Sequence, residues 1–302
     1  MIPFERLGFG KKPEYDRLLQ QSGRGCEYSF ANLYMWGRQE AAIVDGSLLL
    51  FSQFGRSSVY PFPIINGEPK PVLDALIADA ARRGIRCRIT SLSDRDCALL
   101  EELYPGKFQF YPDRDSYDYV YSIDALADLK GKKLQRKRNH LNRFNAAHPD
   151  SRAVPMDEGN LALARDFAAA WHLRRREADP ESDFHLEQIA LRRAFCHFRE
   201  LEMEGMLLME GENILAITLG SRMSPDTFDI HFEKAREGVD GAYAAINAAF
   251  ARHLREKYPE LRYLDREDDL GLPGLRQAKL TYCPEFLIEK SWARLMEDDD
   301  ED

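Results

Sequence analysis

The sequence lacks the features of membrane-spanning, secreted and zinc-ribbon proteins. No apolar run approaches the ~20 residues needed to cross a bilayer, and the longest runs have only the length of a strand. The N-terminus has no basic stretch followed by an apolar core, so no secretory signal is expected. The five cysteines are scattered and form no CxxC pair, which argues against a zinc site or a disulfide framework. We therefore expect a cytoplasmic protein with no integral membrane segment and no bound metal.

Charge is unevenly distributed along the chain. The net charge of −9 argues against a surface devoted to nucleic acid. Residues 297–302 are all acidic, and a frayed, solubilising end is the simplest interpretation. Residues 130–143, in contrast, contain seven Lys or Arg and no acid. This local contrast carries more information about binding than the net charge does.

A chain of 302 residues is expected to form two domains. Residues 1–125 alternate between short strands and helices, including a hairpin that turns at Asp45-Gly46. Residues 126–149 are expected to be a basic linker whose helix covers 132–147. Residues 150–302 are expected to form a second lobe with the acidic tail. This alternation predicts the α/β class, with mixed sheets in both lobes.

The second half has a distinctive order of elements. Helices are predicted over 161–178 and 186–204, followed by three strands over 206–209, 214–219 and 227–233. A loop then leads into a helix over 241–257, and strands follow at 261–265 and 286–289. The third strand alternates apolar and polar residues, which predicts a half-buried strand. This order resembles the layout of a GNAT acyltransferase domain.

Longer stretches carry a more specific resemblance. Residues 118–121, 129–144, 240–247 and 265–284 closely resemble a bacterial family of uncharacterised proteins. That family is related to the C-terminal, cytoplasmic domain of phosphatidylglycerol lysyltransferase. The resemblance implies two tandem GNAT-like lobes, as in the Fem-type aminoacyltransferases, which take an amino acid from aminoacyl-tRNA. The lysyltransferase also has a membrane-embedded portion upstream, and this sequence shows no counterpart of it.

In GNAT domains, the loop before the helix after the fourth strand presents main-chain N–H groups to the pyrophosphate of acyl-CoA. A helix N-terminus suits this task because its N–H donors are free and it carries partial positive charge. The corresponding loop here departs from the strict spacing of the family signature, and Asp240 could instead be the N-cap of the helix. We expect an anion to bind at 238–242, and we expect Gly241→Pro to weaken binding while the fold survives. The residues expected to bind the donor are Arg236, Gly238, Val239, Gly241, Ala242, Tyr243 and Asn247.

Several titratable residues fall where the fourth and fifth GNAT strands separate. His231 could act as a general base because imidazole accepts protons near neutral pH, or it could be a half-exposed strand histidine. The charged cluster at 266–269, after the fifth strand, could hold or deprotonate an ammonium group, or it could be a charged loop pinned by Arg266 and Arg276. The candidate catalytic residues are therefore His231, Glu267 and Asp268, and the candidate substrate-binding residues are Arg266, Arg276 and Lys279.

The basic helix is a candidate polyanion-binding element. Lys and Arg are the residue types that phosphate contacts require, so it could hold a tRNA acceptor stem or CoA. It could equally be a solvated helix face, because Leu134, Leu141 and Phe144 give it only a narrow apolar stripe. The candidate contacts are Lys133, Arg136, Lys137 and Arg138.

The sequence thus predicts an acyl- or aminoacyl-transferase. The donor would be aminoacyl-tRNA or acyl-CoA as a co-substrate, with no tightly bound cofactor. The acceptor would be an amine or hydroxyl of a small molecule, a peptide or a lipid, and tRNA is the expected macromolecular partner. A catalytically silent GNAT-like module that binds a ligand or a protein is the alternative. The sequence itself shows no serine–histidine–acid or cysteine–histidine constellation.

Overall fold

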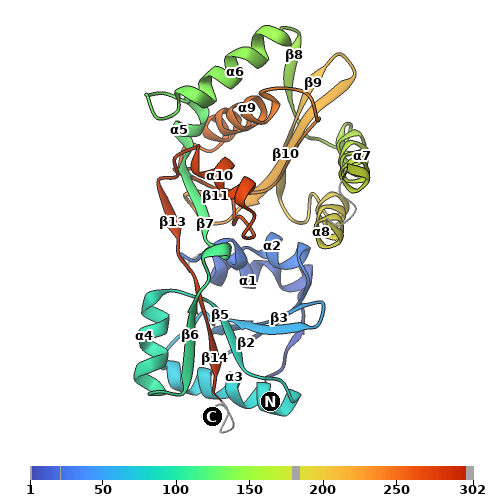
Figure 1. Cartoon of the computed structure of the whole chain (residues 1–302). Coiled ribbons are helices and arrows are strands. Elements are labelled where there is room, and N and C mark those ends of the chain that lie inside the picture. The colour runs from blue at the N-terminus through green and yellow to red at the C-terminus, as the bar shows by residue number, and fades with distance from the viewer. Residues whose placement is uncertain (1, 21, 179–183, 297–302) are drawn as a thin grey trace. The chain divides into compact units, whose positions relative to one another are not determined.

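The computed structural model describes residues 2–20, 22–178 and 184–296, which form two compact units. The first unit comprises Met1–Tyr117 with Ile288–Asp302, and the second comprises Asp118–Leu287. Within the described residues, each unit contains a seven-stranded mixed sheet (Figure 1). The expected α/β class with mixed sheets is confirmed. The acidic tail at 297–302 lies outside the described residues.

The sheet of the first unit has the order β1-β2-β3-β4-β5-β14-β6. Its hairpin turns at Asp45 and Gly46 as predicted, because both residues adopt the positive φ that this two-residue turn requires. The elements are β1 (Glu5–Arg6), α1 (Lys12–Leu19), α2 (Phe30–Met35), β2 (Arg38–Val44), β3 (Ser47–Phe54), β4 (Ser57–Pro61), α3 (Pro69–Arg83), β5 (Arg88–Leu92), α4 (Asp94–Leu103), β6 (Phe108–Pro112) and β14 (Ser291–Leu295).

The sheet of the second unit has the order β13-β7-β12-β11-β10-β9-β8. The helix predicted over 161–178 is found with those bounds, whereas the helix predicted to reach residue 204 ends at Cys196. The elements are β7 (Asp118–Ser122), α5 (Ile123–Asp128), α6 (Gln135–Ala147), β8 (Ser151–Pro155), α7 (Leu161–Ala178), α8 (His185–Cys196), β9 (Met203–Glu210), β10 (Asn213–Arg222), β11 (Thr227–Ala235), α9 (Ala242–Lys257), β12 (Tyr263–Asp265), α10 (Pro273–Leu280) and β13 (Phe286–Ile288).

The bounds of the units differ from the expected lobes because two strands pair outside their own part of the sequence. Strand β7 was expected to close the first lobe, but it pairs with β12 in the second sheet. Strand β14, which was not predicted, returns to the first sheet between β5 and β6. The basic helix α6 does not stand apart as a linker, because it packs on α9 inside the second unit.

Helix α9 organises the core of the second unit. It packs on β9, β10 and β11, with α5 and α6 against its outer side, while α7 and α8 lie on the opposite face of the sheet (Figure 1). The face of α9 toward the sheet carries small and apolar residues, which bring the helix close to the strands. Its most deeply buried apolar side chains include Ile246, Phe250, Ala251 and Leu254.

A bulge interrupts the pairing of β10 with β11. Leu219 faces Phe232 and Ser221 faces Asp229, so two residues of β11 lie opposite Gly220 alone. A Cβ atom on Gly220 would lie 2.0 Å from the main-chain oxygen of Asp229. The bulge therefore requires glycine at this position, and it changes the direction of the β11 side chains beside it.

We expect Gly220→Ala to destabilise the second unit by about 1–3 kcal/mol, because backbone must move to admit the methyl group. Gly274→Ala is a matched control, since Gly274 lies in α10 and a Cβ there would meet nothing within 4 Å. The control should be neutral or stabilising by about 0.5 kcal/mol. Thermal unfolding of both variants measures the difference, and equal melting temperatures would contradict this account of the bulge.

Candidate functional site

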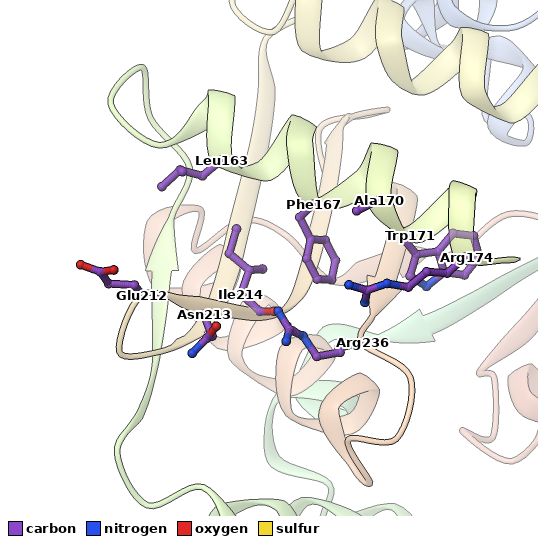
Figure 2. Close-up of a pocket in the computed structure, with 9 residues that line it drawn as sticks. All are labelled: Leu163, Phe167, Ala170, Trp171, Arg174, Glu212, Asn213, Ile214 and Arg236. Atoms are coloured by element: carbon purple, nitrogen blue, oxygen red, sulfur yellow. The ribbon is translucent and has the colours of Figure 1, made fainter.

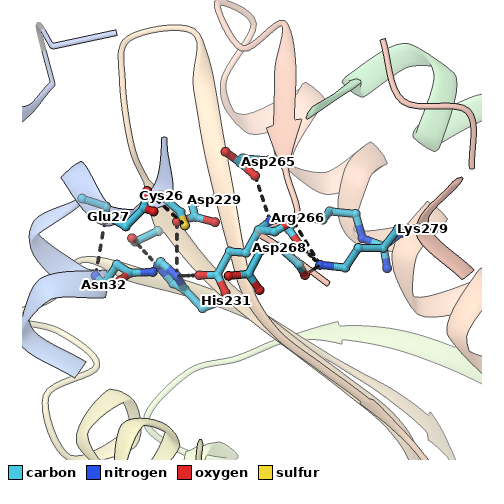
Figure 3. A network of polar contacts seen from close by, with 12 residues as sticks. Cys26, Glu27, Asn32, Asp229, His231, Asp265, Arg266, Asp268 and Lys279 are labelled. Atoms are coloured by element: carbon cyan, nitrogen blue, oxygen red, sulfur yellow. Dashed lines mark hydrogen bonds and ion pairs between the residues drawn. The ribbon is translucent and has the colours of Figure 1, made fainter. Parts of the chain in front are cut away.

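The candidate site lies where β11 and β12 part. The two strands run parallel for three residue pairs and stop pairing after Asp229 and Asp265. Strand β11 continues to Ala235, whereas the chain after β12 enters a loop that begins at Arg266. Polar side chains from both strand ends meet at this separation, and Figure 3 shows His231, Asp229, Arg266 and Asp268 among them.

His231 is held by hydrogen bonds on both ring nitrogens. Its Nε2 lies 2.8 Å from Ser221 Oγ, and its Nδ1 lies 2.9 Å from Glu267 Oε1 and 3.4 Å from Asp229 Oδ2. The His231 side chain is fully buried, so the half-exposed strand histidine that the alternation suggested is wrong. A histidine fixed between a hydroxyl and carboxylates is suited to accept and pass on a proton.

Ser221 is a site residue that the sequence did not indicate. It lies ten positions before His231, and the two side chains meet across the β10–β11 bulge. The folded chain therefore brings together a serine, a histidine and an acid, although no local sequence motif predicts this arrangement. The irregular pairing of β10 with β11 places Ser221 beside His231, and the loop after β12 adds Glu267.

The acidic side of His231 could also hold a cation. Asp229, His231 and Glu267 each place one ligand atom within 4.8 Å of the others. Both carboxylates face the same imidazole nitrogen, so either a proton on Nδ1 or a cation can offset their negative charge. His231 and Glu267, expected as catalytic residues, therefore lie together, although no cation site was expected from the sequence.

Lys279 organises the loop after β12. Its ammonium group donates to the main-chain carbonyls of Arg266, Glu267 and Asp268, and burial lowers its pKa (Figure 3). Expected as a substrate-binding residue, Lys279 instead holds the loop that presents Glu267. Glu267 itself has a positive φ of 56°, a conformation that such a set of hydrogen bonds can maintain.

Arg276 also belongs to the frame of the loop. It donates to both oxygens of Asp269, at 2.9 and 2.7 Å, and Asp269 accepts a further hydrogen bond from Tyr119. Although burial works against ionisation, these hydrogen bonds hold the pKa of Asp269 well below its usual range. For Arg276 the structure thus supports the pinned-loop alternative.

Arg266 is paired inside the separation of the strands. Its Nη2 lies 3.0 Å from Glu233 Oε1, while Glu233 Oε2 accepts from the side-chain amide of Asn247 at 3.2 Å. Asn247, expected to bind the donor, is buried on α9 and positions Glu233 instead. The triplet joins the end of β11, the loop after β12 and the second turn of α9.

The residue that caps the N-terminus of α9 is not the one considered in the sequence analysis. Gly241, in a left-handed conformation, is the N-cap, and no side chain caps the helix. Asp240 instead pairs with His140 and Arg143 of α6, at 3.3 and 3.1 Å. The interpretation of Asp240 as an N-cap is therefore wrong.

Gly241 also has a packing role. A Cβ there would lie 2.4 Å from the main-chain oxygen of His140, and proline cannot adopt its φ of 82°. Gly241→Pro would therefore displace α6, so the expectation that the fold survives this change is not supported. Gly238, by contrast, faces open space.

Free main-chain donors remain at the start of α9. Within the described part of the chain, no main-chain carbonyl accepts from the N–H groups of Gly241, Tyr243 or Ala244. The Tyr243 side chain is exposed, whereas Val239 and Ala242 pack in the core. The expected anion-binding feature therefore reduces to a few N–H groups rather than the whole loop.

A pocket of about 210 Å³ lies between α7 and the start of β10 (Figure 2). Trp171 and Arg174 of α7 face Arg236, whose Nε donates to the main-chain oxygen of Ile214 at 3.2 Å. Arg236 thus lines this pocket, next to Ile214 at the start of β10 (Figure 2). Phe167 and Leu163 complete the apolar part of the wall.

The four cations predicted to bind a polyanion have different environments. Lys133 and Arg136 are exposed. Arg138 donates to the main-chain oxygens of Leu129 and Gly131, so it ties down the turn before the helix. Lys137 leans inward, with its ammonium 3.8 Å from the centre of the Tyr282 ring.

The sequence and the fold of this chain are similar to those of known proteins. Residues 17–294 match the model of the family described as phosphatidylglycerol lysyltransferase, C-terminal. The chain belongs to this family. A crystal structure of a conserved protein of unknown function from Bacteroides thetaiotaomicron shares 36% identity, covers 98% of this chain and 100% of that one, and has a TM-score of 0.92.

More distant solved structures show the same fold. L-PGS from Bacillus licheniformis is 15% identical, with a TM-score of 0.68 and coverage of 99% of this chain and 95% of that one. A tandem GNAT protein from the clavulanic acid biosynthesis pathway is 9% identical, with a TM-score of 0.55 and coverage of 99% and 100%. The chain is therefore a pair of tandem GNAT-like lobes.

An uncharacterized protein of Mycoplasmoides gallisepticum is 27% identical over 179 residues, which are 58% of this chain and 55% of that protein. The match thus spans about half the length of that relative. None of the described helices combines the length and the apolar character needed to cross a bilayer.

The environment of Lys137 predicts a pH-dependent effect on stability. Burial and the neighbouring Arg266 and Arg136 lower the pKa of Lys137 to about 8. The unfolded chain keeps the ordinary, higher pKa, so below pH 8 the charged lysine costs folding free energy, and this cost disappears as pH rises toward 10.5. Lys137→Met should therefore raise the free energy of unfolding near pH 7 by about 1 kcal/mol, after allowance for partial exposure and the lost ring contact.

Chemical unfolding near pH 7 and near pH 10 measures this effect. The gain from Lys137→Met should shrink at the higher pH. Lys133→Met is the matched control, because Lys133 is exposed and should change stability by less than about 0.5 kcal/mol at either pH. A loss of stability of the same size at both pH values would show that the charge of Lys137 is not opposed by its surroundings.

Proposed function

We propose that this protein transfers an aminoacyl group from aminoacyl-tRNA to an amine or hydroxyl acceptor. The observation that carries the proposal is the separation of β11 and β12 after Asp229 and Asp265, with a buried, hydrogen-bonded His231 and Glu267 beside it. Membership of a family named for lysyl transfer supports group transfer as the reaction class. The free cysteines are in keeping with a reaction in the cytoplasm.

The proposed reaction needs a nucleophile, a proton acceptor and charge stabilisation. The acceptor amine or hydroxyl attacks the ester carbonyl of the donor and loses a proton, and the ribose hydroxyl leaves with one. His231, oriented by Ser221 and Glu267, provides the route for the proton. The first N–H groups of α9 and nearby cations provide stabilisation of negative charge.

Aminoacyl-tRNA is the preferred donor because of the exposed cations beside the site. Lys133, just before α6, and Arg136, in its first turn, are exposed, and an extended polyanion can contact both of them. Acyl-CoA is the second candidate, favoured by the N–H groups of Gly241, Tyr243 and Ala244, which donate to no main-chain carbonyl of the described residues. The acceptor is a small molecule, a peptide or a lipid.

The proposal is tested by incubating the purified chain with radiolabelled aminoacyl-tRNAs or acyl-CoA and extracts containing acceptors, and by measuring transfer of label. His231→Gln should lower the rate by about 100-fold, the usual contribution of a general base. His197→Gln is the control, because His197 lies outside the site beside Glu200. No transfer from either donor, and no binding of either, would favour the silent binding module instead.

Salt dependence separates the two donors. If Lys133 and Arg136 contact RNA phosphates, replacing both with Ala should weaken tRNA binding and reduce the log–log salt slope by about 1.4, the release expected for two contacts to a single strand. Affinity for acyl-CoA should be unchanged. A slope that stays the same in the double variant would return these residues to the solvated-helix interpretation.

A further inference from the structure

Two cations from distant parts of the sequence lie on one aromatic ring in the second unit. Lys137 Nζ is 3.8 Å and Arg266 Cζ is 4.8 Å from the centre of the Tyr282 ring. Lys137 belongs to α6, Arg266 follows β12 and Tyr282 follows α10. Like charges repel, so such a pair is expected to be brought together only where something else compensates.

The protein supplies only part of that compensation. Glu233 pairs with Arg266 Nη2, and among the described residues it is the only carboxylate that forms an ion pair with either cation. Arg266 Nη1 is buried and has no hydrogen-bond partner in the described part of the chain. A buried guanidinium nitrogen without an acceptor is costly. One acceptor is therefore missing.

The lowered pKa of Lys137 reflects the same imbalance of charge. Burial and the charges of Arg266 and Arg136 together lower its pKa to about 8, and Glu233 and Cys283 only partly oppose them. Lys137, Arg266 and Glu233 by themselves carry one excess positive charge. A group with a single negative charge would balance the site.

We propose that Lys137 and Arg266 bind a phosphodiester group near the 3′ end of the RNA donor. A phosphodiester carries one negative charge, whereas a phosphomonoester approaches two near neutral pH. The Nη1 group of Arg266 and the ammonium group of Lys137 can each donate hydrogen bonds to phosphate oxygens. The exposed Lys133, in the turn before α6, and Arg136, in the first turn of α6, continue the positive charge outward from Lys137, which favours a chain of phosphates over a single headgroup.

This inference rests on the proposed function, because it assigns a subsite for the donor. It is tested on the folded chain by brief acylation near pH 8 with a small amine-reactive anhydride, followed by mass spectrometry of each lysine. With a pKa of about 8, about half of Lys137 is neutral and reactive, against less than about 1% of an ordinary lysine. The trinucleotide CpCpA is the probe.

Bound CpCpA should raise the pKa of Lys137 by about one unit and slow its acylation about fivefold. Acylation of the exposed Lys133 should change less. Arg266→Gln should abolish the protection, and Lys137→Arg should retain CpCpA affinity measured by calorimetry, whereas Lys137→Met should not. The lysine variants keep the inference testable should Arg266→Gln fail to fold.

Other ligands decide the source of the phosphate. Protection by glycerophosphoglycerol but not by CpCpA would overturn the RNA assignment in favour of a lipid headgroup. Protection only by concentrated inorganic phosphate would overturn it as well. If aminoacyl-tRNA binds and reacts while Lys137 stays unprotected, this inference alone fails, whereas an absence of any transfer or binding removes the proposed function beneath it.

Discussion

The three residue pairs that join β11 to β12 are the constraint on which the second unit depends. Pairing up to Asp229 and Asp265 makes one continuous sheet, and its end leaves the remainder of β11 without a neighbouring strand on that side. The two strands stay apart because hydrogen bonds hold the loop after β12 in place. Lys279 holds three successive carbonyls of that loop, and Asp269 anchors its far end to Arg276 and Tyr119.

Burying so many charges is expensive unless each has partners. The loop meets this requirement by using main-chain carbonyls for Lys279 and a bidentate pair for Arg276. His231 has partners on both ring nitrogens, and Glu233 has one on each carboxylate oxygen. Such groups cannot rearrange cheaply, so the site is preorganised before any ligand arrives. Within the described part of the chain, Arg266 Nη1 and Asn247 Oδ1 are buried atoms of this site that have no hydrogen-bond partner, and of the two only Arg266 Nη1 carries positive charge.

Local patterns sufficed for the elements that have strong periodicity. Helix α7, the α9 helix and the hairpin at Asp45-Gly46 could be predicted because their signals lie within a few consecutive residues. The exchange of β7 and β14 between sheets could not be predicted, since pairing partners far apart in sequence leave no local trace. The same limit applies to Ser221, whose contact with His231 exists only because of a bulge, and to Lys279, whose loop-binding role needs the folded chain.

The basic helix shows why charge composition alone could not assign roles to its residues. Asp240 pairs with His140 and Arg143 at one end of α6, and the helix backbone lies against Gly241, so the rotation of α6 about its axis is fixed. Once that rotation is fixed, helical geometry directs side chains one position apart to different faces. Arg136 therefore points to solvent while Lys137 reaches the Tyr282 ring. In the sequence, the cations of the basic helix look like one continuous surface. In the structure, the contacts of Asp240 with α6 place some of these cations on an outer face and Lys137 at an inner contact.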